Sequence, residues 1–341
     1  MMENKEILGI ASIITISLIV LVPFSGCLEF RKDYALELYD YYENECIVKG
    51  WQKITIDVDG LERQLLWKGP EGSWEYGAII ALHGGGSTYA AWGSNCSKLC
   101  EAYGDPTLVE PQVEFSNLSI TEGFAVFALD STYNVITDEN GYLGGKRFDY
   151  FPQDRANIDV PFIETVITEI IPNLRPLNSS LDVFITGIST GGFMTTLTAT
   201  HLDYLITAFA PVAGGDPYGI HSDFNKYKNL RIMTPGVIYD RETSIPINKI
   251  NAAVSNDYPN ELEWPETIEN IPFKQFHHRE DAMCDISCMD KIQYQLIEHG
   301  YIDDGPYILE GDGKREFYDH MWMEEYNQPM IDFFKNCSNT N

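Results

Sequence analysis

LDVFITGISTGG, residues Leu181 to Gly192, combines three features from which the architecture of this chain can be predicted. It begins with a short apolar run rich in β-branched residues, which is typical of a strand buried on both faces of a sheet. It then makes a Gly-x-Ser-x-Gly turn centred on Ser189. From Phe193 onward apolar residues return every three or four positions, as in a helix. A serine on a turn between a strand and a helix is the context of a nucleophile elbow, so Ser189 is predicted to be a nucleophile.

The glycines beside Ser189 fit this interpretation, because a larger side chain there would collide with the neighbouring strand or helix. The helix that follows offers free N–H groups and a partial positive charge to a developing oxyanion. The alternative is a glycine-rich loop with an incidental serine. The strand before the turn and the helix after it favour the nucleophile.

A second glycine-rich turn is predicted to complete the site. The buried strand Gly77 to Leu82 runs directly into His83-Gly84-Gly85-Gly86. Consecutive glycines free the backbone to turn its N–H groups toward a ligand, although without a serine elbow they would indicate a flexible connector. We expect an oxyanion hole made by the N–H of Thr190 and one from Gly85 or Gly86.

An activated serine needs a base within hydrogen-bonding reach, and in this fold class the base comes last in the chain. The histidines after Ser189 are His201, His221, His277, His278, His299 and His320. His320 follows the last predicted strand, Tyr307 to Glu310, and precedes the closing helix, Met323 to Phe334. We therefore predict that His320 is the base, the alternative being a surface or capping role.

The orienting acid is predicted to be Asp240, at the end of the strand Leu230 to Tyr239. A carboxylate at the C-terminal tip of a strand can reach an imidazole at the same sheet edge. Glu242 is the nearest rival, and Asp281 or Asp285 are outsiders.

Other segments alternate between strands and helices, which indicates an α/β fold with a mostly parallel central sheet and helices on both faces. The hairpin Lys53 to Trp67 turns at Asp59-Gly60 and is predicted to lie at the sheet edge. Further predicted elements are the strands Gly123 to Asp130 and Ile206 to Gly214 and the helix Asn157 to Leu174. The long gap after Asp240 is interpreted as an insertion before the last strand, at about residues 241–292.

With these residues in place, the chain resembles the α/β-hydrolase superfamily, and more narrowly the polyhydroxybutyrate depolymerase and feruloyl esterase-like serine esterases. The resemblance lies in the His83-Gly84 loop, in Asp159-Val160-Pro161-Phe162-Ile163, in the segment from Gly187 to Met194, and in His320-Met321-Trp322. It implies the α/β-hydrolase fold and hydrolysis of a small-molecule or polymeric carboxylic ester through an acyl-enzyme. It implies no metal and no organic cofactor. The alternatives are a serine peptidase of the same fold and a catalytically decayed surface protein that binds a partner.

The chain of 341 residues has a formal net charge of -28 and a sequence pI near 4.4. Such a charge repels phosphate, so nucleic acid is excluded as a partner and phosphorylated substrates are disfavoured. A neutral ester is the expected substrate.

The first 27 residues resemble an export signal. An uncharged run from Ile7 to Phe24 leads into Ser25-Gly26-Cys27, which indicates a lipoprotein whose Cys27 carries the lipid. The alternative is an uncleaved transmembrane anchor. Either interpretation predicts an extracytoplasmic protein attached to the membrane at its N-terminus, with a segment at 28–50 and a catalytic domain at 51–336. In that compartment the remaining cysteines are expected to form up to three disulfides; they are Cys46, Cys96, Cys100, Cys284, Cys288 and Cys337.

Overall fold

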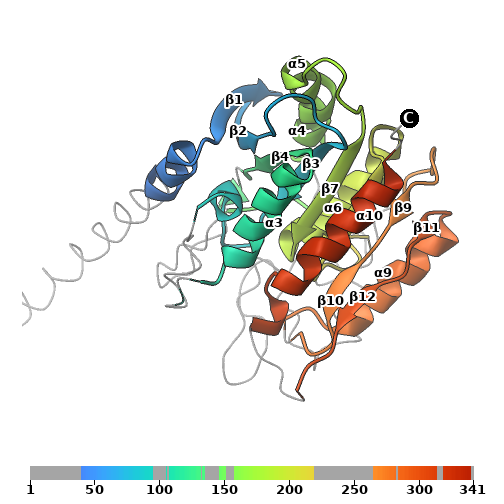
Figure 1. Cartoon of the computed structure of the whole chain (residues 1–341). Helices are drawn as coiled ribbons and strands as arrows, with labels where there is room; N and C mark the ends of the chain where they lie inside the picture. The colour runs from blue at the N-terminus through green and yellow to red at the C-terminus, as the bar shows by residue number, and fades with distance from the viewer. Residues whose placement is uncertain are drawn as a thin grey trace, which may run out of the picture.

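The computed structural model describes residues 40–94, 105, 107–131, 133–134, 146–150, 157–218, 264–281, 283–312 and 318–338. Within these residues ten strands form one sheet, whose main path runs β1-β2-β4-β3-β7-β8-β10-β12, with β9 beside β8 and β11 beside β9 (Figure 1). The strands on the path are β1 (Gln52–Val58), β2 (Leu61–Lys68), β3 (Gly77–Leu82), β4 (Phe124–Leu129), β7 (Val183–Ile188), β8 (Ala208–Val212), β10 (Phe276–His278) and β12 (Tyr307–Leu309). The two remaining strands of the sheet are β9 (Pro272–Phe273) and β11 (Ile302–Asp303), and a separate pair joins β5 (Tyr133–Asn134) to β6 (Lys146–Arg147).

The direction of the strands follows the prediction of a mostly parallel sheet. Strand β2 is antiparallel to β1 and to β4, and the other strand pairs of the main sheet within the described residues are parallel. The hairpin has its predicted two-residue turn, because Val58 pairs with Leu61 and both Asp59 and Gly60 have positive φ. Strands β3, β4 and β7 are buried along their whole length, as expected of parallel strands covered on both faces.

Helices cover both faces of the sheet. The helices are α3 (Glu110–Thr121), α4 (Val160–Thr165), α5 (Ile171–Leu174), α6 (Thr190–His201), α9 (Ile286–Glu298) and α10 (Asn327–Cys337), and a π-helical turn at Val166–Ile170 joins α4 to α5. Residues of α4, α6 and α9 pack in one core cluster with Ala78, Ile80 and Leu82, and residues of α3 and α10 pack in another with Ile79 and Ala81. Successive side chains of β3 therefore serve opposite faces of the sheet.

The predicted boundary of the insertion is wrong in its last part. Strand β10 lies between β8 and β12 in the main sheet, and β9 pairs with β8. Residues from 271 onward, assigned to the insertion, are thus part of the core. Strand β10 has three residues, Phe-His-His, which is too short and too polar to show a strand pattern. The predicted strand Leu230 to Tyr239 lies outside the described residues.

The cysteines correct a second expectation. Cys46, Cys284, Cys288 and Cys337 are free thiols, and the first three are buried. Burial in the core, where a thiol behaves as a small apolar group, accounts for them without a bridge. Cys96, Cys100 and the predicted lipid-bearing Cys27 lie outside the described residues. In the part of the chain that the structure describes, no helix is long and apolar enough to cross a membrane.

Candidate active site

Ser189 has the backbone of a nucleophile elbow. It follows the last residue of β7 and is the N-cap of α6, with φ 55° and ψ −116°. A positive φ is rare for a residue with a side chain, and such strain concentrates at functional sites. Two backbone hydrogen bonds hold the turn: the N–H of Ser189 donates to the carbonyl of Val212, and its own carbonyl accepts from the N–H of Phe193, both at 2.9 Å.

The glycines around Ser189 are required by close approach. A Cβ at Gly191 would lie 2.4 Å from the backbone oxygen of Leu82, so only glycine lets α6 sit against β3. A Cβ at Gly84 would lie 3.7 Å from the Cβ of Ser189. The glycine loop after β3 and the serine elbow after β7 are therefore direct neighbours.

The loop from His83 to Ser87, here called the oxyanion loop because an oxyanion hole is predicted there, has a conformation that distinguishes Gly85 from Gly86 as the possible donor. The N–H of Gly86 donates to the carbonyl of Lys146 at 3.0 Å, so this donor is already engaged. The N–H of Ser87 donates to the carbonyl of Gly84 at 3.2 Å and closes the loop. Gly85 therefore remains the candidate donor of the two glycines named from the sequence. Thr190 begins α6, where a backbone N–H has no partner within the helix.

The carboxylate beside His320 is Asp281. Oδ2 of Asp281 accepts a hydrogen bond of 2.7 Å from Nδ1 of His320, and both side chains are buried. Asp281 follows β10, and His320 ends a short 3₁₀ helix (Tyr318–His320) after β12. The bond fixes the proton on Nδ1 and leaves Nε2 of His320 free to act as a base.

Asp281 is held as an anion. Its Oδ1 accepts from the N–H groups of Met283 and Cys284 at 2.7 and 2.8 Å. Burial by itself would raise the pKa of Asp281, but the charge of His320 and its hydrogen bond outweigh burial, so the pKa lies below its ordinary value. The side chain is fully enclosed, which fixes the carboxylate against His320.

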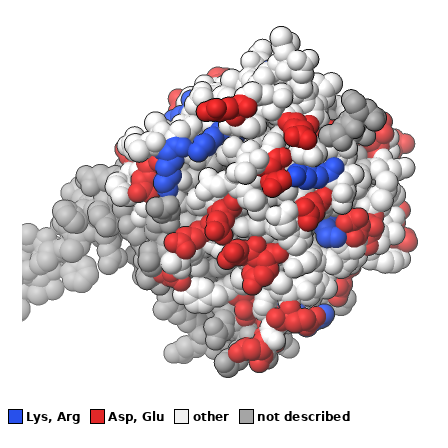
Figure 2. Space-filling model, in the orientation of Figure 1, with Lys and Arg blue, Asp and Glu red and all other residues white. Residues whose placement is uncertain are grey.

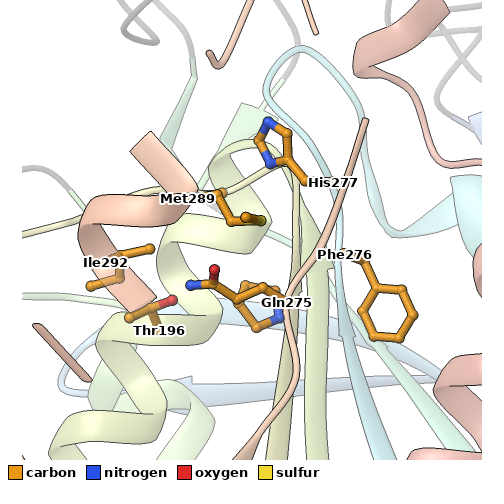
Figure 3. A pocket seen from close by; sticks show the side chains of 8 residues that line it. Thr196, Gln275, Phe276, His277, Met289 and Ile292 are labelled. Atoms are coloured by element: carbon orange, nitrogen blue, oxygen red, sulfur yellow. The ribbon is translucent and has the colours of Figure 1, made fainter. Parts of the chain in front are cut away.

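A second histidine supports the same loop. Nε2 of His277 donates to the carbonyl of Cys284 at 2.8 Å and lies 3.7 Å from Oδ2 of Asp281. Burial lowers the pKa of His277, which favours the neutral ring. Figure 3 shows His277 at one end of a narrow interior space behind the loop, with Gln275 and Met289 among its lining residues. This space lies inside the core and is too narrow for a substrate.

The strand register brings these groups to one edge of the sheet. Val212 of β8 pairs with Ile188 of β7 on one side and with Phe276 of β10 on the other. The end of β7, which is followed by Ser189, is therefore level with the start of β10, which is followed by Asp281. The loop that carries His320 is anchored nearby by Trp322, whose ring packs on Trp92 and whose Nε1 donates to Asn327 at 2.7 Å.

The predicted acid is not among the residues placed here. Asp240 and its rival Glu242 lie outside the described residues, and Asp285 is the N-cap of α9, where it accepts from the N–H of Ser287. Asp281 was named from sequence as an outsider, and in the structure it lies three residues after the short β10. His201 is the last residue of α6, and His299 is the C-cap of α9. Among the described residues, no group of three or more His, Cys, Asp or Glu side chains could hold a metal ion.

No protein-family model matches the chain, and no curated protein matches it. Solved structures do resemble it. The acylaminoacyl peptidase of Pyrococcus horikoshii has a TM-score of 0.52 at 15% identity, covering 85% of this chain and 42% of that chain. A thermostable esterase has a TM-score of 0.47 at 15% identity, covering 85% and 63%, and Est1E from Butyrivibrio proteoclasticus has 0.48 at 13%, covering 84% and 98%.

The chain thus spans less than two thirds of the peptidase and of the thermostable esterase. At these identities the likeness concerns the fold. Together with the sheet order and the serine elbow, it establishes that the chain has the α/β-hydrolase fold.

Proposed function

We propose that the chain is a serine hydrolase that cleaves carboxylic esters, with Ser189 as nucleophile, His320 as base and Asp281 as the orienting acid. The observation that carries the proposal is the Asp281–His320 hydrogen bond of 2.7 Å at the sheet edge where the strained elbow presents Ser189. A strained serine backbone and a buried carboxylate–imidazole pair both cost folding free energy. Acyl transfer accounts for both, because it needs an exposed nucleophile and an oriented base.

In the proposed mechanism His320 takes the proton of Ser189 at Nε2 while the serine oxygen attacks the ester carbonyl. Asp281 stabilises the imidazolium that forms, because it stays ionised beside Nδ1. His320 then gives the proton to the leaving alcohol, and water hydrolyses the acyl-enzyme by the same steps in reverse.

The negative charge on the carbonyl oxygen would be met by the backbone N–H groups of Thr190 and Gly85. Thr190 adds the positive end of the α6 dipole. A donor of this kind contributes roughly 3 kcal/mol to the transition state in enzymes of this class. Gly86 is not given this role, because its N–H is bonded to Lys146.

A fluorophosphonate probe tests the nucleophile. The probe should label Ser189 in the intact protein, and Ser189→Ala should lose both labelling and hydrolysis of p-nitrophenyl esters. Ser73→Ala, at an exposed loop position, is the matched control and should behave like wild type. Activity retained in Ser189→Ala would refute the proposal, and loss of labelling in the control would point to unfolding instead.

The proposed substrate is a neutral ester, in the manner of polyhydroxybutyrate depolymerases and feruloyl esterases. The support is electrostatic: carboxylates predominate over cations on the face drawn in Figure 2, in keeping with the net charge of -28. Relative turnover of methyl ferulate, acetylated xylan, hydroxybutyrate dimers and peptide amides tests it. Faster cleavage of the amides would replace the esterase by a peptidase.

We further propose that the enzyme acts outside the cytoplasm as a lipoprotein. The support is the uncharged run from Ile7 to Phe24 followed by Ser25-Gly26-Cys27. Mass spectrometry of the membrane fraction should find a lipid on an N-terminal Cys27. An intact N-terminal segment would favour a transmembrane anchor instead.

A further inference from the structure

The last two residues of the loop from His83 to Ser87 are hydrogen-bonded to strand β6. The N–H of Gly86 donates to the carbonyl of Lys146 at 3.0 Å, and the N–H of Lys146 donates back to the carbonyl of Ser87 at 3.2 Å. Gly86 has a φ of 82°, a conformation that suits glycine. The peptide between Gly85 and Gly86 is therefore fixed relative to Lys146, next to the peptide that carries the N–H of Gly85.

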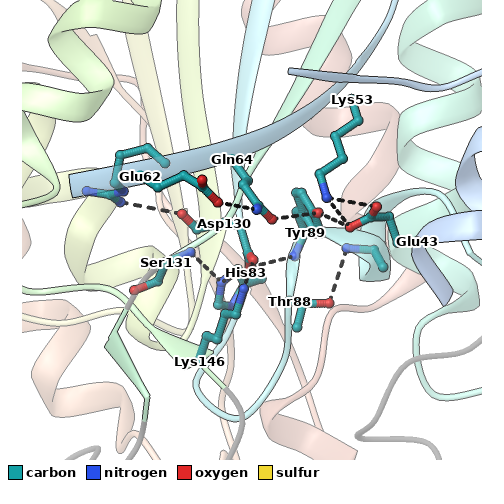
Figure 4. A network of polar contacts seen from close by, with 12 residues as sticks. Glu43, Lys53, Glu62, Gln64, His83, Thr88, Tyr89, Asp130, Ser131 and Lys146 are labelled. Atoms are coloured by element: carbon teal, nitrogen blue, oxygen red, sulfur yellow. Dashed lines mark hydrogen bonds and ion pairs between the residues drawn. The ribbon is translucent and has the colours of Figure 1, made fainter. Parts of the chain in front are cut away.

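The side chain of Lys146 is held by Asp130. Nζ of Lys146 forms an ion pair with Oδ2 of Asp130, which follows β4 and is buried (Figure 4). The other oxygen, Oδ1, accepts from the N–H of Tyr89 at 3.4 Å and lies 3.4 Å from Nε2 of His83. Nδ1 of His83 in turn donates to the carbonyl of Gly84 at 2.8 Å. Asp130 thus holds the end of the loop through Lys146 and lies beside His83 at its start, where Nε2 of His83 accepts from the N–H of Ser131 at 3.3 Å.

Asp130 is ionised in this setting. Burial would raise its pKa, but the hydrogen bond with His83 and the charge of Lys146 outweigh burial and lower the pKa. A buried carboxylate that lost its cation would have to take up a proton or move toward water. Either change would loosen the contacts that fix the loop.

We propose that the Asp130–Lys146 ion pair is a positioning device for catalysis, which holds the loop from His83 to Ser87 so that the N–H of Gly85 faces the reacting carbonyl. The inference rests on the proposed hydrolase function. Neither residue touches the substrate in this scheme. Their effect passes through the loop backbone to the transition state and leaves ground-state binding of the ester unchanged.

The test compares Lys146→Met with wild type on a p-nitrophenyl ester. In Lys146→Met we expect kcat to fall between about tenfold and a hundredfold, which is somewhat less than for loss of an oxyanion donor. We expect KM to stay within about twofold of the wild-type value. A boronic acid forms a tetrahedral adduct on the serine, and we expect its affinity for Lys146→Met to fall by the same factor as kcat. Lys146→Arg keeps the cation and should restore most of the activity.

Lys274→Met is the matched control, because it removes an ion pair of 2.9 Å with Asp304, and these two residues follow β9 and β11. It should leave both constants unchanged. If Lys146→Met does not fold, the double variant Asp130→Asn/Lys146→Met, which buries no unpaired charge, is measured instead and should show the same loss.

Wild-type kcat in Lys146→Met or in the double variant would overturn the inference. A fall in kcat with unchanged boronic acid affinity would also overturn it, since the loss would then arise away from the oxyanion. Failure of the proposed function looks different: hydrolysis would persist in Ser189→Ala.

Discussion

Nδ1 of His320 donates a hydrogen bond of 2.7 Å to Oδ2 of Asp281, 39 residues earlier in the chain. The two residues follow neighbouring parallel strands, β10 and β12, whose paired residues run from Phe276 and Tyr307 onward. The pair is therefore set by the sheet register and not by local sequence. It makes the loop after β10 the place where the imidazole is oriented.

Asp281→Asn should lower kcat by roughly three to four orders of magnitude, because an amide at this position favours the wrong tautomer of His320. Asp240→Asn and Glu242→Gln should have little effect. Steady-state kinetics on one ester decides between them. If Asp240→Asn were the most damaging of the three, the acid would have to be assigned to Asp240.

Asp281 should also contribute to stability in a pH-dependent way. Its folded pKa lies below the ordinary value of 3.8, so the contribution is fully present above that value and is lost as pH falls through the folded pKa. The difference in unfolding free energy between wild type and Asp281→Asn should therefore be constant from pH 5 to about 4 and narrow below it. Denaturant unfolding at fixed pH values measures this. A gap that widens toward acid would contradict the lowered pKa.

Gly191→Ala should destabilise the fold by about 1 to 3 kcal/mol, because the added Cβ would lie 2.4 Å from a backbone oxygen that cannot move aside. Gly84→Ala is the matched comparison. Its Cβ would make ordinary contacts of 3.5 Å with Ile188, so stability should change by less than about 0.5 kcal/mol. Thermal and denaturant unfolding of both variants checks the ranking, which equal losses would refute.

Cys337 should react slowly with alkylating agents, at a rate that rises with pH. Burial raises the pKa of this thiol to about 12. The thiolate is the form that reacts. Its alkylation rate should therefore increase about tenfold per pH unit from pH 8 to 10, whereas a free cysteine levels off near pH 9. Peptide mass spectrometry after timed alkylation gives the rate. If Cys337 reacted only after reduction, it would be in a disulfide.

The serine elbow and the edge hairpin could be predicted from sequence, because both depend on local rules. Gly-x-Ser-x-Gly between an apolar run and a helical pattern leaves few other conformations, and Asp59-Gly60 selects a two-residue turn. His320 was predicted to be the base from chain order, and it ends a short 3₁₀ helix that follows β12.

The acid could not be predicted in the same way. Strand β10 spans three residues, and its two histidines hide any apolar alternation. Its place in the sheet comes from pairing with β8 and β12, which are distant in sequence, so no window of residues contains the signal. The ion pair of Asp130 and Lys146 is hidden for the same reason, since the two residues are 16 positions apart in the sequence.

The hairpin has a consequence for how copies of the protein meet in solution. Strand β1 is a seven-residue strand at the border of the sheet, where unpaired backbone groups invite another chain to add to it. Lys53 and Asp57 place charges along this border, and the ammonium of Lys53 is paired at 2.9 Å with Glu43 of the preceding helical turn. Charged side chains on a border strand oppose strand addition. We therefore expect the charges of the hairpin to oppose aggregation, so that neutral residues at both positions would lower the concentration at which the protein stays dispersed.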